Sequence, residues 1–303
     1  MPLYLGIDGG GTQTTCAVGD DLGVLATSVA GGSNIVRVGE PEARTNLREA
    51  ITKACAAAGV SPAAVEAAVI GIAGSSVPPV KEAVAALIGD LVPGEIEVVG
   101  DMVIAMEAAF PGLPGVVVIS GTGSVAFGRN HLGEAGRAGG WGSAISDEGS
   151  GYWIGRAAVS AAARARDAAA STTLLRGILD CWRLNSPEEL VQKGNASPAF
   201  AELFPLVESA ATAGDPLAEQ ILVAAGSELA TMASVVIGRL WPAEQAVWVA
   251  IGGGVFAHSP LVRCTFWRQL RAARPCAAVS FKIIQPVAGA LWMARRMTAG
   301  TRE

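Results

Sequence analysis

The sequence predicts an α/β protein that folds as two domains. Its 303 residues are 51% hydrophobic and 16% charged, which is enough apolar material for two cores. Strands and helices alternate through residues 1–110, an order that suits a mixed sheet flanked by helices. Near Gly115 a strand–glycine–strand pattern begins a second time, and the chain that follows is mainly helical. We therefore place a domain boundary there.

The chain opens with a predicted β-hairpin. Residues 3–7 and 14–18 favour strands, and Gly9-Gly10-Gly11-Thr12 forms the turn between them. Glycines without a Cβ let successive N–H groups point at one spot and cradle an anion, and Asp8 could hold Mg²⁺ against phosphate oxygens. The turn lacks the Gly-Lys-Ser/Thr of a Walker loop, and a strand rather than a helix follows it, unlike a dinucleotide fingerprint. Taken alone, an ordinary glycine-rich hairpin remains the alternative.

The rest of the first domain alternates strands and helices. A glycine loop carries Ser33 and Asn34. Residues 41–58 have apolar side chains at spacings of four, three and four, which mark one helical face, and Gly59 supplies the C-cap. The remaining elements are predicted as strands at 24–29, 67–73 and 95–99, the second ending in Gly74-Ser75-Ser76, and as helices at 78–88 and 102–110.

Asp101 lies between a predicted strand and a predicted helix. Asp is a favoured N-cap residue, so a purely structural cap is one interpretation. The carboxyl ends of strands in open α/β sheets also face the ligand crevice, so a functional role is the other. The two interpretations do not exclude each other.

The second domain repeats the glycine turn twice. Residues 116–120 predict a strand, Gly121-Thr122-Gly123 a turn, and residues 125–127 a returning strand. Residues 247–251 predict another strand that ends in Gly252-Gly253-Gly254, with a helix at 260–271. Two hairpin turns suit the phosphates of a nucleotide, and a strand–glycine–helix turn suits its nucleoside.

Between these turns the second domain is helical. Gly139-Gly140-Trp141-Gly142 must be a loop, and Ser146-Asp147-Glu148 has the composition of a helix N-cap. A Trp flanked by glycines on a loop is well placed to pack against a sugar face, although it could also be core. Between the turns, helices are predicted at 152–166, 173–184, 187–193, 198–213 and 217–240. After the third turn, a strand is predicted at 279–283 and a final helix at 285–297.

Together these motifs resemble the N-acetylglucosamine kinase branch of the sugar kinase/heat-shock/actin ATPase superfamily, within the BadF/BadG/BcrA/BcrD ATPase family. The resemblance runs from Leu5 to about Ala294; each segment is short, but their order and spacing are specific. The segments are Gly6-Ile7-Asp8-Gly9-Gly10-Gly11-Thr12, Ser33-Asn34, Asp101, Ser120-Gly121-Thr122-Gly123-Ser124, Gly139-Gly140-Trp141-Gly142, residues 146–153, Gly252-Gly253-Gly254 and residues 286–290.

The resemblance implies a two-domain actin-like ATPase (ribonuclease H-like) fold with a cleft between the domains. Residues 1–115 with 285–303 would form the sugar and phosphate side, and residues 116–284 the nucleotide side. It also implies ATP and Mg²⁺ as cofactors, with Asp101 as catalytic base and Asp8 at the metal. The implied sugar contacts are Asn34, Thr122, Gly140, Trp141 and Asp147, and the implied nucleotide contacts are Gly9, Gly10, Gly11, Thr12, Gly121, Thr122, Gly123, Gly252, Gly253 and Gly254.

The implied reaction is transfer of the γ-phosphoryl group of ATP to the 6-hydroxyl of an amino sugar. N-acetylglucosamine is the first expectation, with glucosamine and N-acetylmuramic acid as alternatives. Two other classes stay open: an ATPase that activates a CoA-ester dehydratase or reductase through a shared iron–sulfur cluster, and a sugar sensor without turnover. No cysteine lies between residues 56 and 180, near the phosphate turns of the second domain, which argues against the activator.

Bulk composition excludes several partners. A net charge of −5 and a pI near 5.2 argue against nucleic acid and acidic membranes. We expect no transmembrane helix and no signal peptide, because no continuous apolar run is long enough and Asp8 follows the N-terminus closely. Five scattered cysteines and two distant histidines make zinc improbable and suit a reducing cytoplasm. We also expect a homodimer.

Overall fold

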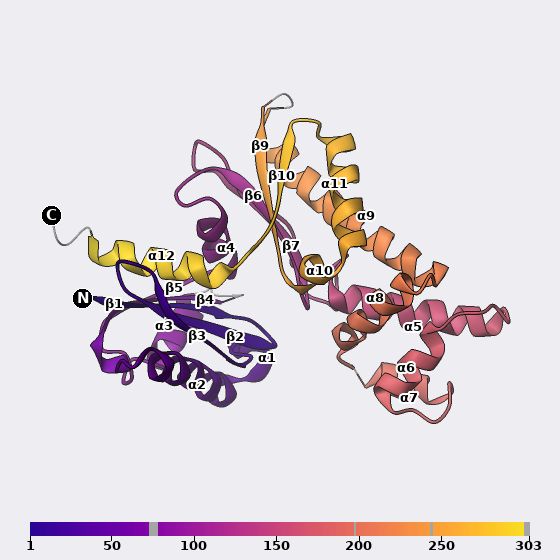
Figure 1. Cartoon of the computed structure of the whole chain (residues 1–303), viewed down its shortest axis with the longest axis horizontal. Coiled ribbons are helices and arrows are strands. Elements are labelled where there is room, and N and C mark those ends of the chain that lie inside the picture. The colour runs from indigo at the N-terminus through magenta and orange to yellow at the C-terminus, as the bar shows by residue number, and fades with distance from the viewer. Residues whose placement is uncertain (73–77, 197, 243–244, 300–303) are drawn as a thin grey trace. The chain divides into compact units, whose positions relative to one another are not determined.

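The chain forms two compact units, each with its own sheet. A computed structural model describes residues 1–72, 78–196, 198–242 and 245–299. The first unit comprises Met1–Leu113 and Ile284–Glu303, and the second comprises Pro114–Ile283. Each unit contains a five-stranded mixed sheet (Figure 1). The end of the chain therefore returns to the unit in which the chain began.

The first sheet brings the ends of three parallel strands to one edge. Its order is β3-β2-β1-β4-β5. Strand β1 pairs antiparallel with β2 and parallel with β4, and β4 pairs parallel with β5. In this register Asp8 lies beside Gly71, and Gly71 beside Val99. The strands are β1 (Leu3–Gly9), β2 (Gln13–Gly19), β3 (Val24–Gly31), β4 (Val65–Ile72) and β5 (Glu95–Val99).

Helices cover both faces of this sheet, which is why its central strands read as nearly continuous apolar runs. Leu5 and Ile7 pack in the core shared with α2, whereas Tyr4 packs on the opposite face with α12 and α4 (Figure 1). A Cβ on Gly6 would overlap the backbone of α12 at Leu291, so this glycine permits close packing of helix on strand. The helices are α1 (Ile35–Val38), α2 (Glu40–Ala58), α3 (Pro78–Ala86), α4 (Asp101–Ala109) and α12 (Pro286–Ala299), with a 3₁₀ turn η1 (Pro62–Ala64).

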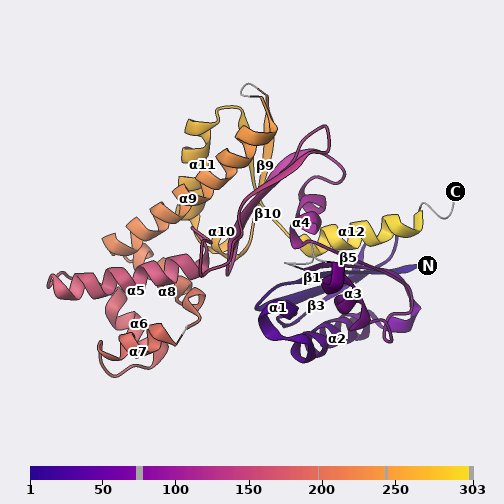
Figure 2. The same ribbon diagram turned by 180° about the vertical axis from the view of Figure 1, so that it is seen from behind.

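The second sheet is built around a hairpin. Its order is β10-β9-β6-β7-β8, with β6 antiparallel to β7 and parallel to β9 (Figure 2). Strand β6 contains the fully buried residues Val116, Val117 and Val118, and the turn Gly121-Thr122-Gly123 joins it to β7. The strands are β6 (Gly115–Ser120), β7 (Ser124–Arg129), β8 (Ala135–Gly139), β9 (Val247–Gly252) and β10 (Ala277–Ile284).

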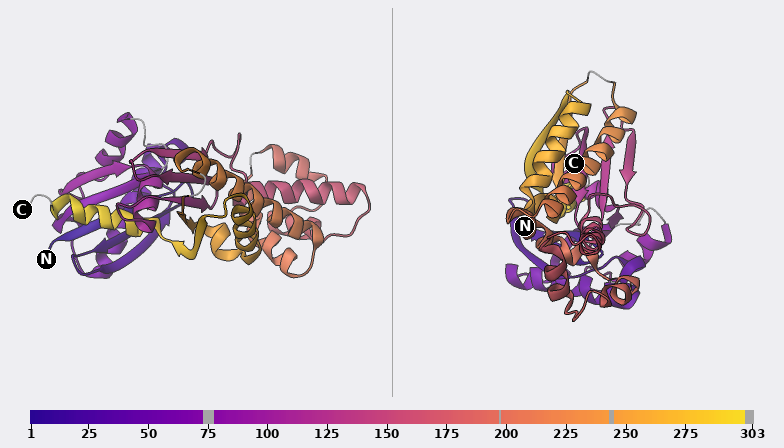
Figure 3. Two further views of the ribbon diagram at one scale, coloured as in Figure 1. Left: turned by 90° about the horizontal axis from the view of Figure 1, so that it is seen from above. Right: turned by 90° about the vertical axis from the view of Figure 1, so that its right-hand side faces the viewer.

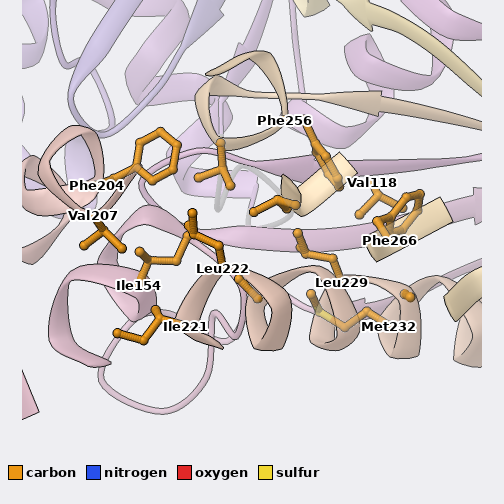
Figure 4. Packing of buried hydrophobic residues seen from close by; sticks show 14 of the residues in the cluster. Val118, Ile154, Phe204, Val207, Ile221, Leu222, Leu229, Met232, Phe256 and Phe266 are labelled. Atoms are coloured by element: carbon orange, nitrogen blue, oxygen red, sulfur yellow. The ribbon is translucent and has the colours of Figure 1, made fainter. Parts of the chain in front are cut away.

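Seven helices are described in the second unit, and α9 is central to its core. Leu222 and Leu229 of α9 are fully buried, and α9 lies beside α11 (Figure 3). Phe256 and Phe266 pack edge to face in the same cluster, 5.2 Å between ring centroids (Figure 4). The helices are α5 (Gly151–Asp167), α6 (Leu174–Trp182), α7 (Glu189–Asn195), α8 (Phe204–Thr212), α9 (Pro216–Leu240), α10 (Gly254–His258) and α11 (Pro260–Ala273), with a 3₁₀ turn η2 (Phe200–Leu203).

Helix α9 alone, among the helices searched in the described residues, has the length and composition of a membrane span. Its most apolar 18-residue window has a mean hydropathy of 1.8, and 56% of that window is buried inside the protein. Charged Glu219, Glu228 and Arg239 interrupt the apolar residues, which is why the sequence shows no continuous apolar run there. A mostly buried helix of this kind is what the core of a second domain requires.

Among the described residues are four short elements that the sequence pattern does not indicate. These are α1 in the loop after Asn34, the 3₁₀ turn η1, α10, which begins directly at Gly254, and β8, whose last residue Gly139 the sequence predicts as part of a loop. The 198–213 segment is divided into η2 and α8 rather than one helix. The turn predicted at Gly74-Ser75-Ser76 lies outside the described residues.

Candidate active site

Two carboxylates lie close together at the carboxyl edge of the first sheet. Asp8 is the penultimate residue of β1, and Asp101 follows β5 on the same edge. Burial and then the charge of Asp101 raise the pKa of Asp8 to about 6. Two carboxylates in one partly desolvated place repel each other, and a cation bound between them would remove that cost.

Asp101 is not the N-cap that the sequence allows. Gly100 is the N-cap of α4, and Asp101 is the first residue of the helix. Its Oδ1 accepts a hydrogen bond of 3.0 Å from the Met102 N–H, in the first turn where a negative charge is favoured. The capping interpretation of Asp101 is therefore wrong in its detail, because the glycine before it takes that position.

The first glycine turn is held by its own backbone. The Gly10 N–H donates to the Gln13 carbonyl at 2.9 Å, and the Gly10 carbonyl accepts from Ser33 and Asn34. A Cβ on Gly10 would lie 2.8 Å from the Gln13 oxygen, and one on Gly9 would lie 2.7 Å from Ser33 Oγ. None of Gly9, Gly10 and Gly11 has a positive φ. Close approach within the turn, rather than left-handed backbone, is thus the reason for glycine here.

Asn34 and Arg37 lie on the small helix that covers this turn. Asn34 is the N-cap of α1, and its Oδ1 accepts from the Val36 N–H at 3.0 Å. The Arg37 side chain lies over Gly11, with Cδ 2.8 Å and Nη1 3.0 Å from the place that a Cβ would occupy. Arg37 is exposed. Sequence reasoning missed this residue, because nothing in the pattern around 35–38 indicates a helix.

The second glycine turn lies at the start of α5. The Gly121 N–H donates to the Gly123 carbonyl at 2.9 Å, and the Gly121 carbonyl accepts from Gly151 at 2.8 Å. The Thr122 carbonyl accepts from the Tyr152 N–H at 3.3 Å. A Cβ on Gly121 would meet nothing within 4 Å, so the space beside this residue is open. The open side of a glycine turn at a helix N-terminus is suited to a phosphate.

Asp147 packs directly on this second turn. Its Oδ2 lies 2.7 Å from where a Cβ of Gly123 would be, and only 6% of the residue is exposed. Burial raises the pKa of the Asp147 carboxyl, while hydrogen bonds from the Ser124 and Gly142 N–H groups partly offset the rise. Asp147 also has a φ of 67°, which costs a non-glycine residue about 1 kcal/mol or more.

The N-cap of α5 does not lie within residues 146–148, where the sequence predicts it. Ser150 is the N-cap of α5, and its Oγ accepts from the Trp153 N–H at 3.1 Å. Capping therefore does not explain Asp147. A buried carboxylate in a strained backbone is the kind of feature that functional sites retain.

Gly140 and Trp141 follow β8 on the same loop. Gly139, Gly140 and Gly142 all have a positive φ, which only glycine adopts at low cost. These turns leave Trp141 63% exposed, and the Arg137 guanidinium stacks 4.8 Å from the centre of its ring. Trp141 is thus not a core residue.

The third glycine turn touches the second. Gly253 has a φ of 91°, and a Cβ there would overlap the Ser120 carbonyl beside Gly121. Gly254 begins α10, and a Cβ on it would meet nothing within 4 Å. With Gly252 at the end of β9, the second unit brings both of its glycine turns and Asp147 together.

A cavity of about 670 Å³ lies between α8 and the end of α10. His258, which lines the cavity, is the last residue of the five-residue helix α10, and Gly254 is its first residue. Sequence reasoning missed the cavity, because its lining comes from two segments whose proximity no pattern indicates. The lining residues are Phe204, Pro205, Glu208, Ser209, Thr212, Ala213 and His258.

The family model described as the BadF/BadG/BcrA/BcrD ATPase family matches residues 5–293. The chain belongs to this family. It is 36% identical over 262 residues to the N-acetylmuramic acid/N-acetylglucosamine kinase of Clostridium acetobutylicum, covering 84% of this chain and 86% of that protein. It is 30% identical over 255 residues to the N-acetyl-D-glucosamine kinase of Dictyostelium discoideum, covering 78% and 80%.

Solved structures confirm the predicted fold class. A Chromobacterium violaceum protein provisionally assigned as an N-acetylglucosamine kinase superposes with a TM-score of 0.77 at 25% identity, over 97% of this chain and 99% of that one. A ROK family glucokinase from Streptomyces griseus superposes with a TM-score of 0.66 at 19% identity, over 97% and 99%. The BadF/BadG/BcrA/BcrD family member described here thus has the α/β fold of the actin-like ATPases.

Membership of this ATPase family implies ATP, and the first unit has carboxylates that fit its metal. Among the described residues, no three His, Cys, Asp or Glu side chains form a complete metal cage. Mg²⁺ in phosphoryl-transfer proteins needs no such cage, because one or two carboxylates suffice when phosphate oxygens and water complete the shell. Asp8 and Asp101 provide that kind of donor set.

Proposed function

We propose that this protein is an ATP-dependent kinase that phosphorylates the 6-hydroxyl of an amino sugar, with N-acetylglucosamine as the first substrate. The proximity of Asp8 and Asp101 beside the first glycine turn is the observation that carries the proposal. Phosphoryl transfer needs a phosphate cradle, a metal, an oriented acceptor and a place for the acceptor proton. The relatives named above, which are N-acetylglucosamine and N-acetylmuramic acid kinases, support the class of substrate.

In the proposed reaction Asp101 is the general base. It takes the proton of the sugar 6-hydroxyl as that oxygen bonds to the γ-phosphorus, while the bond from phosphorus to the bridging oxygen breaks and ADP leaves. Asp8 would hold Mg²⁺, which would supply positive charge against the phosphate oxygens. Gly9, Gly10, Gly11 and Thr12 would form the first phosphate turn. The Gly10 N–H donates to the Gln13 carbonyl, so the N–H groups of its neighbours would approach the phosphates. A general base of this kind contributes about 10²–10⁴-fold to the rate.

The second unit would supply the remaining nucleotide contacts. Gly121, Thr122 and Gly123 form the second phosphate turn, and the open space at Gly121 supports this role. Gly252, Gly253 and Gly254 would approach the adenosine. The cavity between α8 and α10 has the volume and the largely apolar lining of a small-molecule site, which supports placing the adenine there.

The sugar contacts are proposed at five residues. Asn34 and Asp147 would hydrogen-bond hydroxyls, Thr122 would lie between sugar and phosphate, and Gly140 would approach the ring through its backbone. Trp141 offers an exposed indole for the sugar face, which its stacking on Arg137 orients. These groups fit any amino hexose, so glucosamine and N-acetylmuramic acid remain the alternative substrates. The glucosamine alternative is supported by the chain's 27% identity to a glucosamine kinase of Vibrio cholerae.

The cysteines favour a kinase over an activating ATPase. An activator that shares an iron–sulfur cluster needs accessible cysteines near its phosphate turns. Cys16, which follows the first turn on β2, is completely buried, and burial raises the pKa of its thiol far above the usual range. The exposed cysteines are Cys181, Cys264 and Cys276, on or after helices of the second unit. A homodimer and a cytoplasmic location stay predictions.

A coupled assay of ADP release with a panel of sugars tests the proposal. The panel contains N-acetylglucosamine, N-acetylmuramic acid, glucosamine and glucose, each with Mg-ATP. We expect sugar-dependent ADP release with at least one amino sugar above glucose, and a 6-phosphate product. Sugar binding without ADP release would indicate a sensor instead. ADP release without any sugar, in a coloured iron–sulfur protein, would indicate an activating ATPase.

A further inference from the structure

A groove lies between α5 and α9 of the second unit, and none of its lining residues is among the contacts proposed above for ATP or sugar. Its volume is about 380 Å³, which is within the range of small-molecule sites. Arg156, Ser160 and Arg164 of α5 line it at spacings of four residues, so they lie along one face of that helix. None of the described residues that line the groove is acidic.

The two arginines of the groove have no anionic partner within the described part of the chain. Helix α5 carries three arginines, and the third, Arg166, lies outside the groove and pairs with Glu188 at 2.6 Å. Arg156 forms neither a hydrogen bond nor an ion pair with the described residues, and Arg164 donates only to the neutral Ser160 hydroxyl, at 2.8 Å. Two guanidinium charges therefore line the groove without a counter-ion.

The hydrogen bond to Ser160 draws Arg164 toward Arg156. It places the Arg164 guanidinium one helical turn, about 5.4 Å, closer to the N-terminus of α5 than its own Cα. Like charges on one helix face repel, and an anion held between them would replace that repulsion with two attractive contacts. A phosphate monoester carries about −1.5 to −2 charges, which matches two guanidinium groups better than the single charge of a carboxylate does.

The remainder of the lining is suited to a sugar attached to that phosphate. Trp153 lies one turn before Arg156 on α5 and is half-buried, so part of its indole is available to a sugar face. Gln220 faces the groove from α9, and its exposed amide has no hydrogen-bond partner among the described residues. An amide both donates and accepts, as contact with sugar hydroxyls requires.

We propose that this groove binds a phosphorylated sugar, with the phosphate between Arg156 and Arg164, a hydroxyl on Gln220 and the ring against Trp153. The proposal concerns binding and does not depend on the proposed reaction. Arginine presents a planar fork that binds phosphate with two parallel hydrogen bonds, so both arginines contribute more than charge alone.

Calorimetric titration with glucose 6-phosphate tests the proposal. Arg156→Ala and Arg164→Ala each weaken its binding by about tenfold to a hundredfold, because each removes a charge-assisted contact. Arg156→Lys restores only part of the loss, since it keeps the charge without the fork. Arg166→Ala makes the same change in net charge on the same helix, outside the groove, and leaves the Kd within about twofold.

Titrations with inorganic phosphate and sulfate separate the phosphate contact from the sugar contact. Gln220→Ala weakens the binding of glucose 6-phosphate several-fold and leaves that of inorganic phosphate unchanged, because the amide touches only the sugar. Sulfate that binds as tightly as glucose 6-phosphate would indicate an adventitious ion only, and would overturn the proposal.

Three further results would also overturn it. The unchanged protein could fail to bind glucose 6-phosphate, or could bind it with an affinity that Arg156→Ala and Arg164→Ala leave unaltered, which would place the ligand at another site. An equal loss in Arg166→Ala would show that net charge alone attracts the anion. Melting temperatures of all variants check folding. Because every measurement is of binding, a protein that phosphorylates no sugar would contradict the proposed function and leave this test valid.

Discussion

At the scale of one residue, Asp8 is a carboxylate whose ionised form is unfavourable in the ligand-free protein. Its pKa is raised from 3.8 to about 6 by burial and by Asp101. Between these two pH values the folded protein binds more protons at Asp8 than the unfolded chain does. The ionised carboxylate therefore destabilises the ligand-free protein above pH 6, and this cost disappears as the pH falls toward 3.8. A shift of this size corresponds to roughly 3 kcal/mol.

The first prediction concerns Asp8→Asn without ligand. An amide carries no charge, so the variant melts at a higher temperature than the unchanged protein at pH 8. The difference shrinks as the pH falls through 6, and it vanishes near pH 4 because Asp8 is then protonated in both states. Differential scanning calorimetry from pH 4 to 8 measures it, with Glu82→Gln on an exposed face of α3 as a pH-independent control. A variant that is less stable at pH 8 would show that Asp8 is not under this strain.

The second prediction concerns Asp101→Asn. Because Gly100 is the N-cap and an Asn Oδ1 can still accept from the Met102 N–H, we expect little change in melting temperature. Asn cannot take a proton, so kcat falls about 10²–10⁴-fold while the KM for sugar and ATP changes far less. The same change removes a charge that raises the pKa of Asp8, so that pKa falls. A folded variant with more than about a tenth of the original kcat would lie outside the general-base range.

At the scale of the element, sequence reasoning succeeds for long helices and buried strands and fails for short helices. The strand β5 and the long helices α2 and α9 were predictable, because apolar residues repeat over enough positions to define a buried face. The helices α1 and α10 have four and five residues, which is too short for a periodic pattern. Arg37 and the cavity near His258 were missed for that reason.

The order of strands in the sheet is the second feature that local sequence patterns do not predict. Asp8 and Asp101 are 93 positions apart in sequence; Asp8 lies near the end of β1, and Asp101 begins α4. They meet only because β4 inserts between β1 and β5 with all three strands parallel. The local pattern predicts each strand, but the order of strands in the sheet is decided by long-range packing. Only the resemblance to a known family placed the two carboxylates in one site beforehand.

The third prediction tests the second glycine turn as an element. Gly121 has no positive φ and a Cβ there meets nothing within 4 Å, so Gly121→Ala leaves the melting temperature of the free protein within about 1 °C. The added methyl occupies space proposed for phosphate, so ATP binds at least about tenfold more weakly by calorimetric titration. Gly23→Ala, at another open glycine without positive φ, is the matched control. Unchanged ATP affinity in Gly121→Ala would remove this turn from the nucleotide site.

The whole molecule carries a net charge of −5 and would bind a nucleotide that is itself strongly anionic. Its 22 lysines and arginines include only four lysines, and none of the three glycine turns contains a lysine. Backbone N–H groups can direct a phosphate, but they cannot neutralise its charge as a lysine in a Walker loop does. We therefore expect ATP binding, and not catalysis alone, to require a divalent cation.

The last prediction follows from that charge balance. ATP with Mg²⁺ raises the melting temperature, because a ligand that binds only the folded protein at about 100 times its Kd stabilises it by about 2.7 kcal/mol. Excess EDTA abolishes the rise, whereas EDTA alone has no effect. The stabilisation also weakens as the pH falls below 6, since Asp8 must lose its proton before it can hold the metal. Thermal shifts with ATP, with and without Mg²⁺, at pH 5 and pH 8 measure both effects. Equal stabilisation by ATP in EDTA at both pH values would show that neither the metal nor Asp8 takes part in binding the nucleotide.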